Sequence, residues 1–184
     1  MRTSPLTEYQ RALLEQARAI VPGPPPPPWE TGVAVFAGGA LAAGWTHDEH
    51  IVVISTNGYS VSNPATGERL VRDRDEQRMY TFLSPDNLSF ALPDTDEQVR
   101  IFGVWGGDGS HVTSDGWNVE AIYPWWPEVD VVIWPPRGPG GAGYFDGAYL
   151  LDLAGIGTWR GCGFSPSGKY LMLLDSAGAQ VYYR

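Results

Sequence analysis

The first part of the chain carries apolar residues at every third or fourth position, which is the spacing of one face of an α-helix. The residues on this stripe are Leu6, Tyr9, Leu13, Ala17 and Ile20. Ser4 is suited to cap such a helix, Pro5 to occupy its first turn and Pro22 to end it. The pattern predicts one N-terminal amphipathic helix. The prolines at 24–28 that follow predict an extended strap anchored by Trp29, although such stretches are also ligands of domains with aromatic grooves.

From Thr31 onward, short apolar or alternating runs are separated by turns rich in Gly, Pro, Asn and Asp. We count about thirteen strand candidates of this kind against a single convincing helix. They are residues 33–36, 41–45, 51–55, 59–62, 68–72, 88–92, 99–105, 117–123, 129–134, 149–153, 158–162, 170–174 and 180–183. The charged stretch 72–78 predicts a solvated loop, and 79–83 fits either a strand or a short helical turn.

These elements predict a mainly β protein with one N-terminal amphipathic helix. We expect the helix and the strap to occupy residues 1–30 and a single antiparallel β domain to occupy 31–184. Short strands separated by regular turns fit either a propeller-like arc or a sandwich, and the sequence leaves both open.

Two stretches, 44–61 and 163–184, share one order of strand, turn, strand, turn and strand. Asn57-Gly58 in the first is a strong hairpin signal, because both residues tolerate a positive φ. Trp45 in the first stretch matches Phe164 in the second. We therefore expect both aromatic side chains to be core residues at the same structural position.

The 184 residues carry a formal charge of −9 and give a pI of about 4.6. An acidic chain is repelled by nucleic acid and by anionic membranes, whereas a basic protein would be attracted. Cys162 is the only cysteine, so no intrachain disulfide can form. The N-terminus has no apolar signal-peptide core, and no apolar run approaches the roughly 18 residues of a membrane helix. We expect a cytoplasmic protein that binds neither nucleic acid nor membranes.

Three groups of residues resemble catalytic or metal-binding sets, but each lacks an essential part. The histidines of 47–50 are three positions apart on a predicted turn, without the helical spacing or further ligands of a zinc site. Asp108, His111 and Asp115 lie in glycine-rich loops that match neither a calcium loop nor a phosphate-binding loop. Cys162 has no recognisable base nearby and is interpreted as a small buried hydrophobe. We expect no catalytic residues, no metal and no cofactor.

Most of the eight tryptophans fall in predicted strands, but Trp125 and Trp126 are adjacent in a proline-flanked corner. Neighbouring residues of an extended chain face opposite ways, so one of the two should be exposed unless the corner is covered. Exposed tryptophans often anchor protein interfaces. The candidate partner-binding residues, which include nearby acidic loops, are Trp125, Trp126, Asp94, Asp96, Glu97 and Asp108.

The stretch Gly163-Phe-Ser-Pro-Ser-Gly-Lys-Tyr-Leu-Met-Leu-Leu resembles a hairpin of a WD40-like propeller, as does Gly44-Trp-Thr-His-Asp-Glu-His-Ile-Val-Val-Ile. The chain departs from the WD40 pattern, because it has no Trp-Asp strand end, no Gly-His start and no regular repeat through its middle. The wider pattern of glycine turns is similar to that of small stand-alone bacterial proteins, some of which look like immunity partners of polymorphic toxins.

Three function hypotheses follow. The first, which the acidic charge and the resemblance favour, is a non-catalytic immunity protein that binds and occludes a basic toxin domain. The second is a β module that binds a carbohydrate or small ligand through exposed Trp and Tyr side chains. The third is a hydrolase using Asp108, His111 and Asp115, which requires these side chains to meet in space.

Overall fold

The computed structural model describes residues 6–125, 128–136 and 143–184 and confirms a mainly β, antiparallel fold. The helices and strands within these residues are α1 (Glu8–Ala19), β1 (Glu30–Phe36), β2 (Ala40–Trp45), β3 (Ile51–Ser55), β4 (Gly58–Ser62), β5 (Arg69–Asp73), α2 (Glu76–Tyr80), β6 (Ser89–Ala91), β7 (Gln98–Gly103), β8 (Asn118–Trp125), β9 (Glu128–Trp134), β10 (Tyr149–Leu150), β11 (Trp159–Phe164), β12 (Tyr170–Asp175) and β13 (Gly178–Tyr183). Neither described helix is long and apolar enough to cross a membrane.

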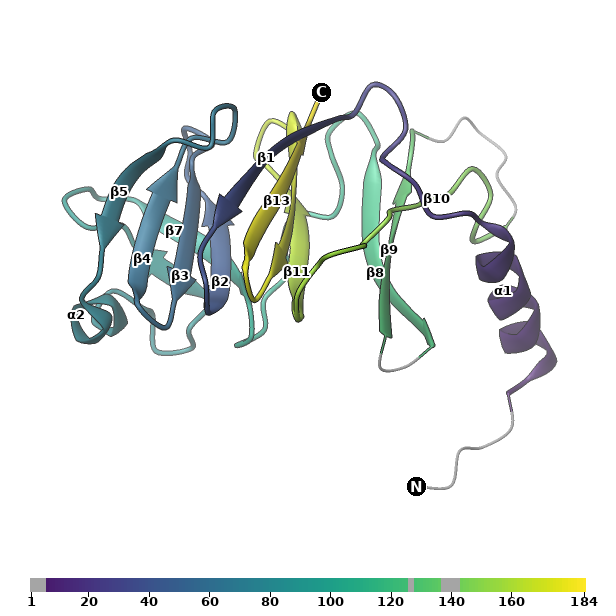
Figure 1. Cartoon of the computed structure of the whole chain (residues 1–184), viewed down its shortest axis with the longest axis horizontal. Helices are drawn as coiled ribbons and strands as arrows, with labels where there is room; N and C mark the ends of the chain where they lie inside the picture. Colours follow the sequence, from purple (N-terminus) through teal and green to yellow (C-terminus); the bar gives the residue numbers. More distant parts are fainter. Residues whose placement is uncertain (1–5, 126–127, 137–142) are drawn as a thin grey trace.

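The strands form three sheets that lie side by side in an open row, with α1 at one end (Figure 1). The curled sheet, with strand order β5-β4-β3-β2-β7-β6, bends into a half-barrel at the other end. The central sheet has the order β1-β13-β12-β11, and the terminal sheet β10-β9-β8 lies next to α1. Of the two arrangements that the sequence left open, the row is closer to an arc of stacked sheets than to a two-layer sandwich.

The central sheet is buried on both faces, which explains the unbroken apolar sequence of β12. Successive residues of a strand point to opposite faces. Leu171 and Leu173 accordingly pack toward the terminal sheet, against residues such as Val131. Met172 and Leu174 pack toward the curled sheet. A further core, with Phe90 and Met79 among its members, fills the concave side of the curled sheet.

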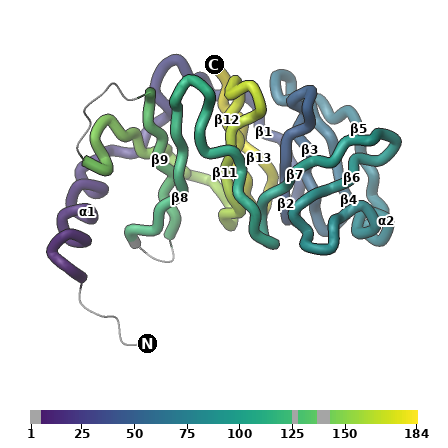
Figure 2. Tube along the Cα trace, turned by 180° about the vertical axis from the view of Figure 1, so that it is seen from behind, coloured from purple at the N-terminus to yellow at the C-terminus, as the bar shows by residue number. Residues whose placement is uncertain are grey.

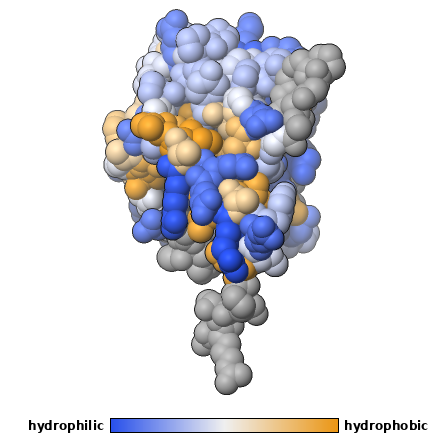
Figure 3. Space-filling view, turned by 90° about the vertical axis from the view of Figure 1, so that its right-hand side faces the viewer, coloured by the Kyte–Doolittle hydropathy of each residue, from blue (hydrophilic) through white to orange (hydrophobic). Residues whose placement is uncertain are grey.

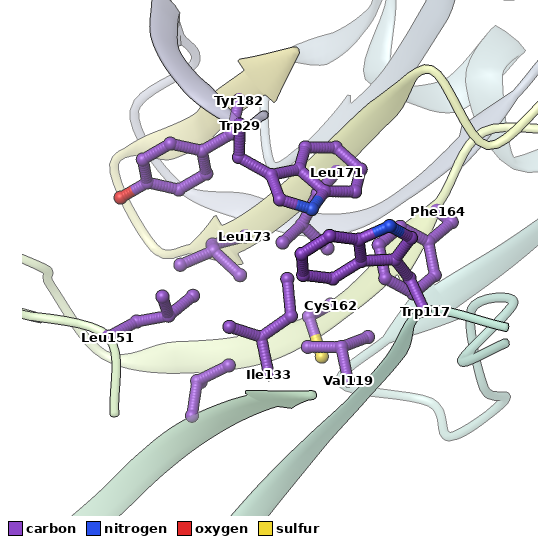
Figure 4. Packing of buried hydrophobic residues seen from close by; sticks show 11 residues of the cluster. Trp29, Trp117, Val119, Ile133, Leu151, Cys162, Phe164, Leu171, Leu173 and Tyr182 are labelled. Atoms are coloured by element: carbon purple, nitrogen blue, oxygen red, sulfur yellow. The ribbon is translucent and has the colours of Figure 1, made fainter. Parts of the chain in front are cut away.

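The first and last strands lie next to each other in the central sheet. β1 pairs antiparallel with β13, and β13 pairs with β12, so the N-terminal strand completes a sheet made otherwise from the end of the chain. Before β1, the strap delivers Trp29 into the core between the central and terminal sheets, where its ring stacks on Phe164 at 5.5 Å and meets Trp117 edge-on at 5.7 Å (Figure 4). The prediction that Trp29 anchors the strap is confirmed.

Helix α1 begins later than the sequence indicates. Thr7, not Ser4, is the N-cap, and it forms a capping box with Gln10 in which each side chain accepts a hydrogen bond from the other residue's backbone N–H. The capping box satisfies two backbone donors of the first turn, whereas Ser4 and Pro5 fall outside the described residues. Tyr9 is also 68% exposed, so the apolar stripe that packs on the sheet is narrower than predicted.

The prediction of a solvated loop over 72–78 is wrong where the short helix α2 begins at Glu76, whereas of the two alternatives for 79–83 the helical turn is the one that Met79 and Tyr80 adopt. Asp75 caps the short helix α2 by accepting a hydrogen bond from the Arg78 backbone N–H at 2.9 Å. The helix places Met79 in the core of the curled sheet with none of its surface exposed. A helix this short offers only one buried residue, so no periodic pattern could reveal it.

The two matched stretches occupy equivalent places in neighbouring sheets, as the sequence predicts. Trp45 and Phe164 each end the first strand of a unit, although Trp45 is only partly buried and stacks on Tyr170. Trp45 pairs with Ile51 and Phe164 with Leu171, so the second turn is one residue longer. The two turns also touch, since a Glu49 carboxylate oxygen accepts hydrogen bonds from Ser165 and Ser167 at 2.8 Å.

A glycine precedes each matched aromatic residue because the backbone of a neighbouring segment lies very close to the strand there. A Cβ atom on Gly44 would lie 2.2 Å from the carbonyl oxygen of Arg100 in β7. A Cβ atom on Gly163 would lie 2.7 Å from the Cα atom of Gly109. Both neighbours are backbone atoms that no side-chain rotation can move away. The Gly-aromatic pair is therefore a packing signature of the two units.

We predict that Gly44→Ala and Gly163→Ala each lower the free energy of unfolding by about 1–3 kcal/mol, because the added methyl group forces the neighbouring backbones apart. Gly38→Ala is the matched control, since nothing lies within 4 Å of a Cβ atom there, and it should change stability by less than about 0.5 kcal/mol. Urea unfolding of the three variants measures the difference. Equal stability of Gly163→Ala and Gly38→Ala would contradict a close approach of the backbone at Gly109 to Gly163.

Candidate functional site

The residues proposed from the sequence as partner-binding do not come together. Asp94, Asp96 and Glu97 lie between β6 and β7, where a Glu97 carboxylate oxygen accepts a hydrogen bond from the His47 backbone N–H at 2.6 Å and lies 2.9 Å from His47 Nδ1. This loop supports the β2–β3 turn at the edge of the row where the chain ends. Within the described parts of the chain, no group of three or more His, Cys, Asp or Glu residues could hold a metal ion.

Trp125 lies at the opposite edge of the row. It is the last residue of β8, and its backbone pairs with Glu128 at the end of the β8–β9 hairpin. Figure 1 shows that this hairpin end and the C-terminus point in opposite directions. Trp126 lies outside the described residues. Trp125 and the acidic loop therefore belong to different faces of the molecule.

Asp108 and His111 line a cavity of about 390 Å³ beside β11, which contacts both β7 and β8. The backbones of these three strands can be followed in Figure 2. Trp159 and Arg160 are also in its wall. Cys162 is at its base, where burial and then the negative charge of Asp108 raise the pKa of the thiol to about 12. Such a thiol is protonated and inert at neutral pH, consistent with the interpretation of Cys162 as a small hydrophobe.

Asp115 is not in this cavity, because it binds the last residue of the chain. Its two carboxylate oxygens accept hydrogen bonds from the Arg184 guanidinium at 2.6 and 2.7 Å, and Thr113 donates another. The Arg184 guanidinium also lies over the Trp29 ring at 5.0 Å. Asp108, His111 and Asp115 thus do not form a triad, and the hydrolase hypothesis loses the geometry on which it depended.

A groove of about 340 Å³ separates α1 from the end of β8. Leu6 and Leu13 line it on the helix side, and Ile122, Tyr123 and Pro124 line it on the strand side. Figure 3 views this end of the molecule and shows apolar residues gathered on the face, with hydrophilic side chains among them. Ile20, directly after the helix, packs with Val132 and Trp134 on the outer face of the terminal sheet, but the contact of α1 with β8 is incomplete.

The groove adjoins an acidic residue of unusual environment, Asp130. In β9 it is the direct cross-strand partner of Ile122, so both side chains lie on the face that α1 covers. Asp130 is half-buried, and its Oδ2 atom is buried without a hydrogen-bond partner among the described residues. Burial, followed by the negative charge of Glu128, raises the pKa of this carboxyl group.

The sequence analysis identified neither the groove nor Asp130. The signal for the groove was the adjacent pair Leu13 and Leu14, both in the groove wall, because two neighbouring leucines widen the apolar face of the helix. Asp130 interrupts a strand of otherwise apolar character, and that interruption was the available signal.

Comparison with known proteins finds no match to this chain among protein-family models, curated proteins or solved structures. The candidate site therefore has to be judged from its own residues.

We predict that Asp115→Asn and Arg184→Ala each destabilise the protein at neutral pH by breaking the same ion pair. Hydrogen bonds from Arg184 and then Thr113 hold the pKa of Asp115 far below its usual value near 3.9. Its contribution to stability is therefore complete above about pH 5 and is lost as the pH falls through the native-state pKa.

Thermal unfolding from about pH 7 down to about pH 2 tests this pair. The gap in melting temperature between wild type and Asp115→Asn should narrow as the pH falls, and Arg184→Ala should follow the same course. A gap that stays constant down to the lowest pH would show that the charge of Asp115 does not stabilise the fold.

Proposed function

We propose that this chain is a non-catalytic protein-binding protein that captures a basic partner with the face formed by α1 and the terminal sheet. The observation that carries this proposal is the apolar groove between α1 and β8. Protein interfaces have an apolar, often aromatic core with a polar rim. Here Tyr9, Tyr123 and Tyr144 are 68%, 46% and 39% exposed, and the last two line the groove.

Aromatic side chains at such a place suit an interface because they combine a large apolar area with a polar tip. Pro124, in the groove wall, directly precedes Trp125. The acidic loop around Asp96 belongs to another face of the molecule. The groove replaces that loop as the proposed contact surface.

The charge of −9 supports a basic partner, since long-range attraction raises the rate of encounter and disfavours acidic competitors. The specific form of the proposal is a bacterial immunity protein that occludes a basic toxin domain. This form rests on the sequence resemblance and on charge, and the groove supplies the contact surface that it needs.

A second candidate function is the binding of a carbohydrate or small ligand in the cavity beside β11. Its volume of about 390 Å³ falls in the range of small-molecule sites. Trp159 offers an aromatic face, while Asp108 and Arg160 offer hydrogen-bonding groups of opposite charge. A glycan array on which the protein binds nothing would remove the carbohydrate form of this candidate.

We predict that Leu6→Lys weakens binding to a basic toxin domain encoded by a neighbouring gene by about tenfold or more, because it replaces an apolar contact with a repelling charge. Leu70→Lys is the matched control. Leu70 is 45% exposed against 46% for Leu6, but it lies on β5 at the far end of the row.

Titration calorimetry on the purified proteins measures both affinities. Toxin binding that is equally sensitive to Leu6→Lys and Leu70→Lys would contradict the groove as the contact surface. If the wild-type protein does not bind the toxin domain encoded by a neighbouring gene, the proposal that this chain is an immunity protein is contradicted.

A further inference from the structure

We infer that Asp130 is the residue that selects the partner, by accepting a lysine or arginine side chain from an amphipathic segment whose apolar residues fill the groove beside α1. This inference rests on the proposed protein-binding function and adds to it the chemistry of the bound segment. Three observations carry it: the position of Asp130, its missing partner and the apolar groove beside it.

The position follows from the sheet register. Asp130 stands opposite Ile122, and Ile122 is part of the groove wall. Glu128 lies two positions away on the same strand, which places its side chain on the same face. A segment lying in the groove would therefore pass beside two carboxylates that belong to one strand.

The missing partner distinguishes Asp130 from two other acidic residues of the fold, Glu120 and Asp115. Glu120 on β8 accepts a hydrogen bond from the Tyr144 hydroxyl, and Asp115 binds Arg184. Asp130 Oδ2 has no such donor among the described residues, and the only charge that contributes to its raised pKa is the negative charge of Glu128. A half-buried carboxylate without a donor is unfavourable in the free protein.

The chemistry of the occupant follows from these surroundings. A cation placed beside Asp130 would be attracted both by its carboxylate and by that of Glu128. Because the carboxylate is already partly removed from water, forming the pair costs less desolvation than it would at an exposed site. The apolar walls of the groove require that the same segment also carries apolar side chains. A helix with one apolar face and a cationic residue beside that face provides both.

The first test uses stability alone. Asp130→Asn removes the unpaired charge and should raise the melting temperature of the isolated protein by about 2–4 °C. Glu68→Gln is the matched control, because it removes one negative charge from an exposed residue on the far side of the row and should leave the melting temperature unchanged. A lower melting temperature for Asp130→Asn would overturn the inference, since the carboxylate would then be a structural acceptor.

The second test uses a yeast-displayed library of short amphipathic helical peptides as the probe. Peptides selected on wild type should carry Lys or Arg next to their apolar face. They should bind Asp130→Asn about tenfold or more weakly and Glu68→Gln equally well.

The outcomes separate this inference from the proposed function. Peptides that lose affinity with Leu6→Lys but bind Asp130→Asn as tightly as wild type would overturn the role of Asp130 and leave the groove as the contact surface. A library that yields no groove-binding peptide would contradict both.

Discussion

The burial of the central sheet on both faces is the constraint on which the rest of the structure depends. Its middle strand, β12, is apolar on both sides, so neither face can be left in water. The curled sheet covers one face and the terminal sheet covers the other. The sheet also needs a fourth strand beside β13, and only the N-terminal segment supplies it. The order of the whole row follows from this requirement.

The same requirement explains the corner where Trp29 and Arg184 meet. The strap has to cross the terminal sheet before it enters the central sheet as β1, and Trp29 fixes it at that crossing. Arg184 then ties the other chain end to the loop that carries Asp115. Helix α1, which precedes the strap, reaches the outer face of the terminal sheet and covers only part of it. The groove therefore arises because α1 covers the outer face of the last sheet in the row only in part.

Local signals made the fold class, the β12 strand and the two matched hairpins predictable. The turn at Asn57-Gly58 and the apolar run 170–174 carry their conformations in a few adjacent residues. The sequence offered a short helical turn near α2 but could not decide for it or fix its bounds, because its one buried residue, Met79, is fixed by tertiary packing. The partner-binding residues were chosen from residue type and loop position, and neither reveals which loops share an edge of the row. The glycines at 44 and 163 show the same limit, since only the backbone segments that lie against them in the folded chain explain them.

Asp115 and Asp130 show why residue type alone could not locate the site. Asp115 lies in a glycine-rich loop and resembled a catalytic residue. In the structure, however, Arg184 and Thr113 donate hydrogen bonds to its carboxylate, and this charged form stabilises the fold. Asp130 lies in a predicted strand of mostly apolar residues. Its carboxylate is nevertheless half-buried, and its Oδ2 atom accepts no hydrogen bond from a described residue. A fold selected for stability alone would place an apolar residue or an amide opposite Ile122. An unfavourable group kept beside an open apolar groove is better explained by what it binds than by what it supports.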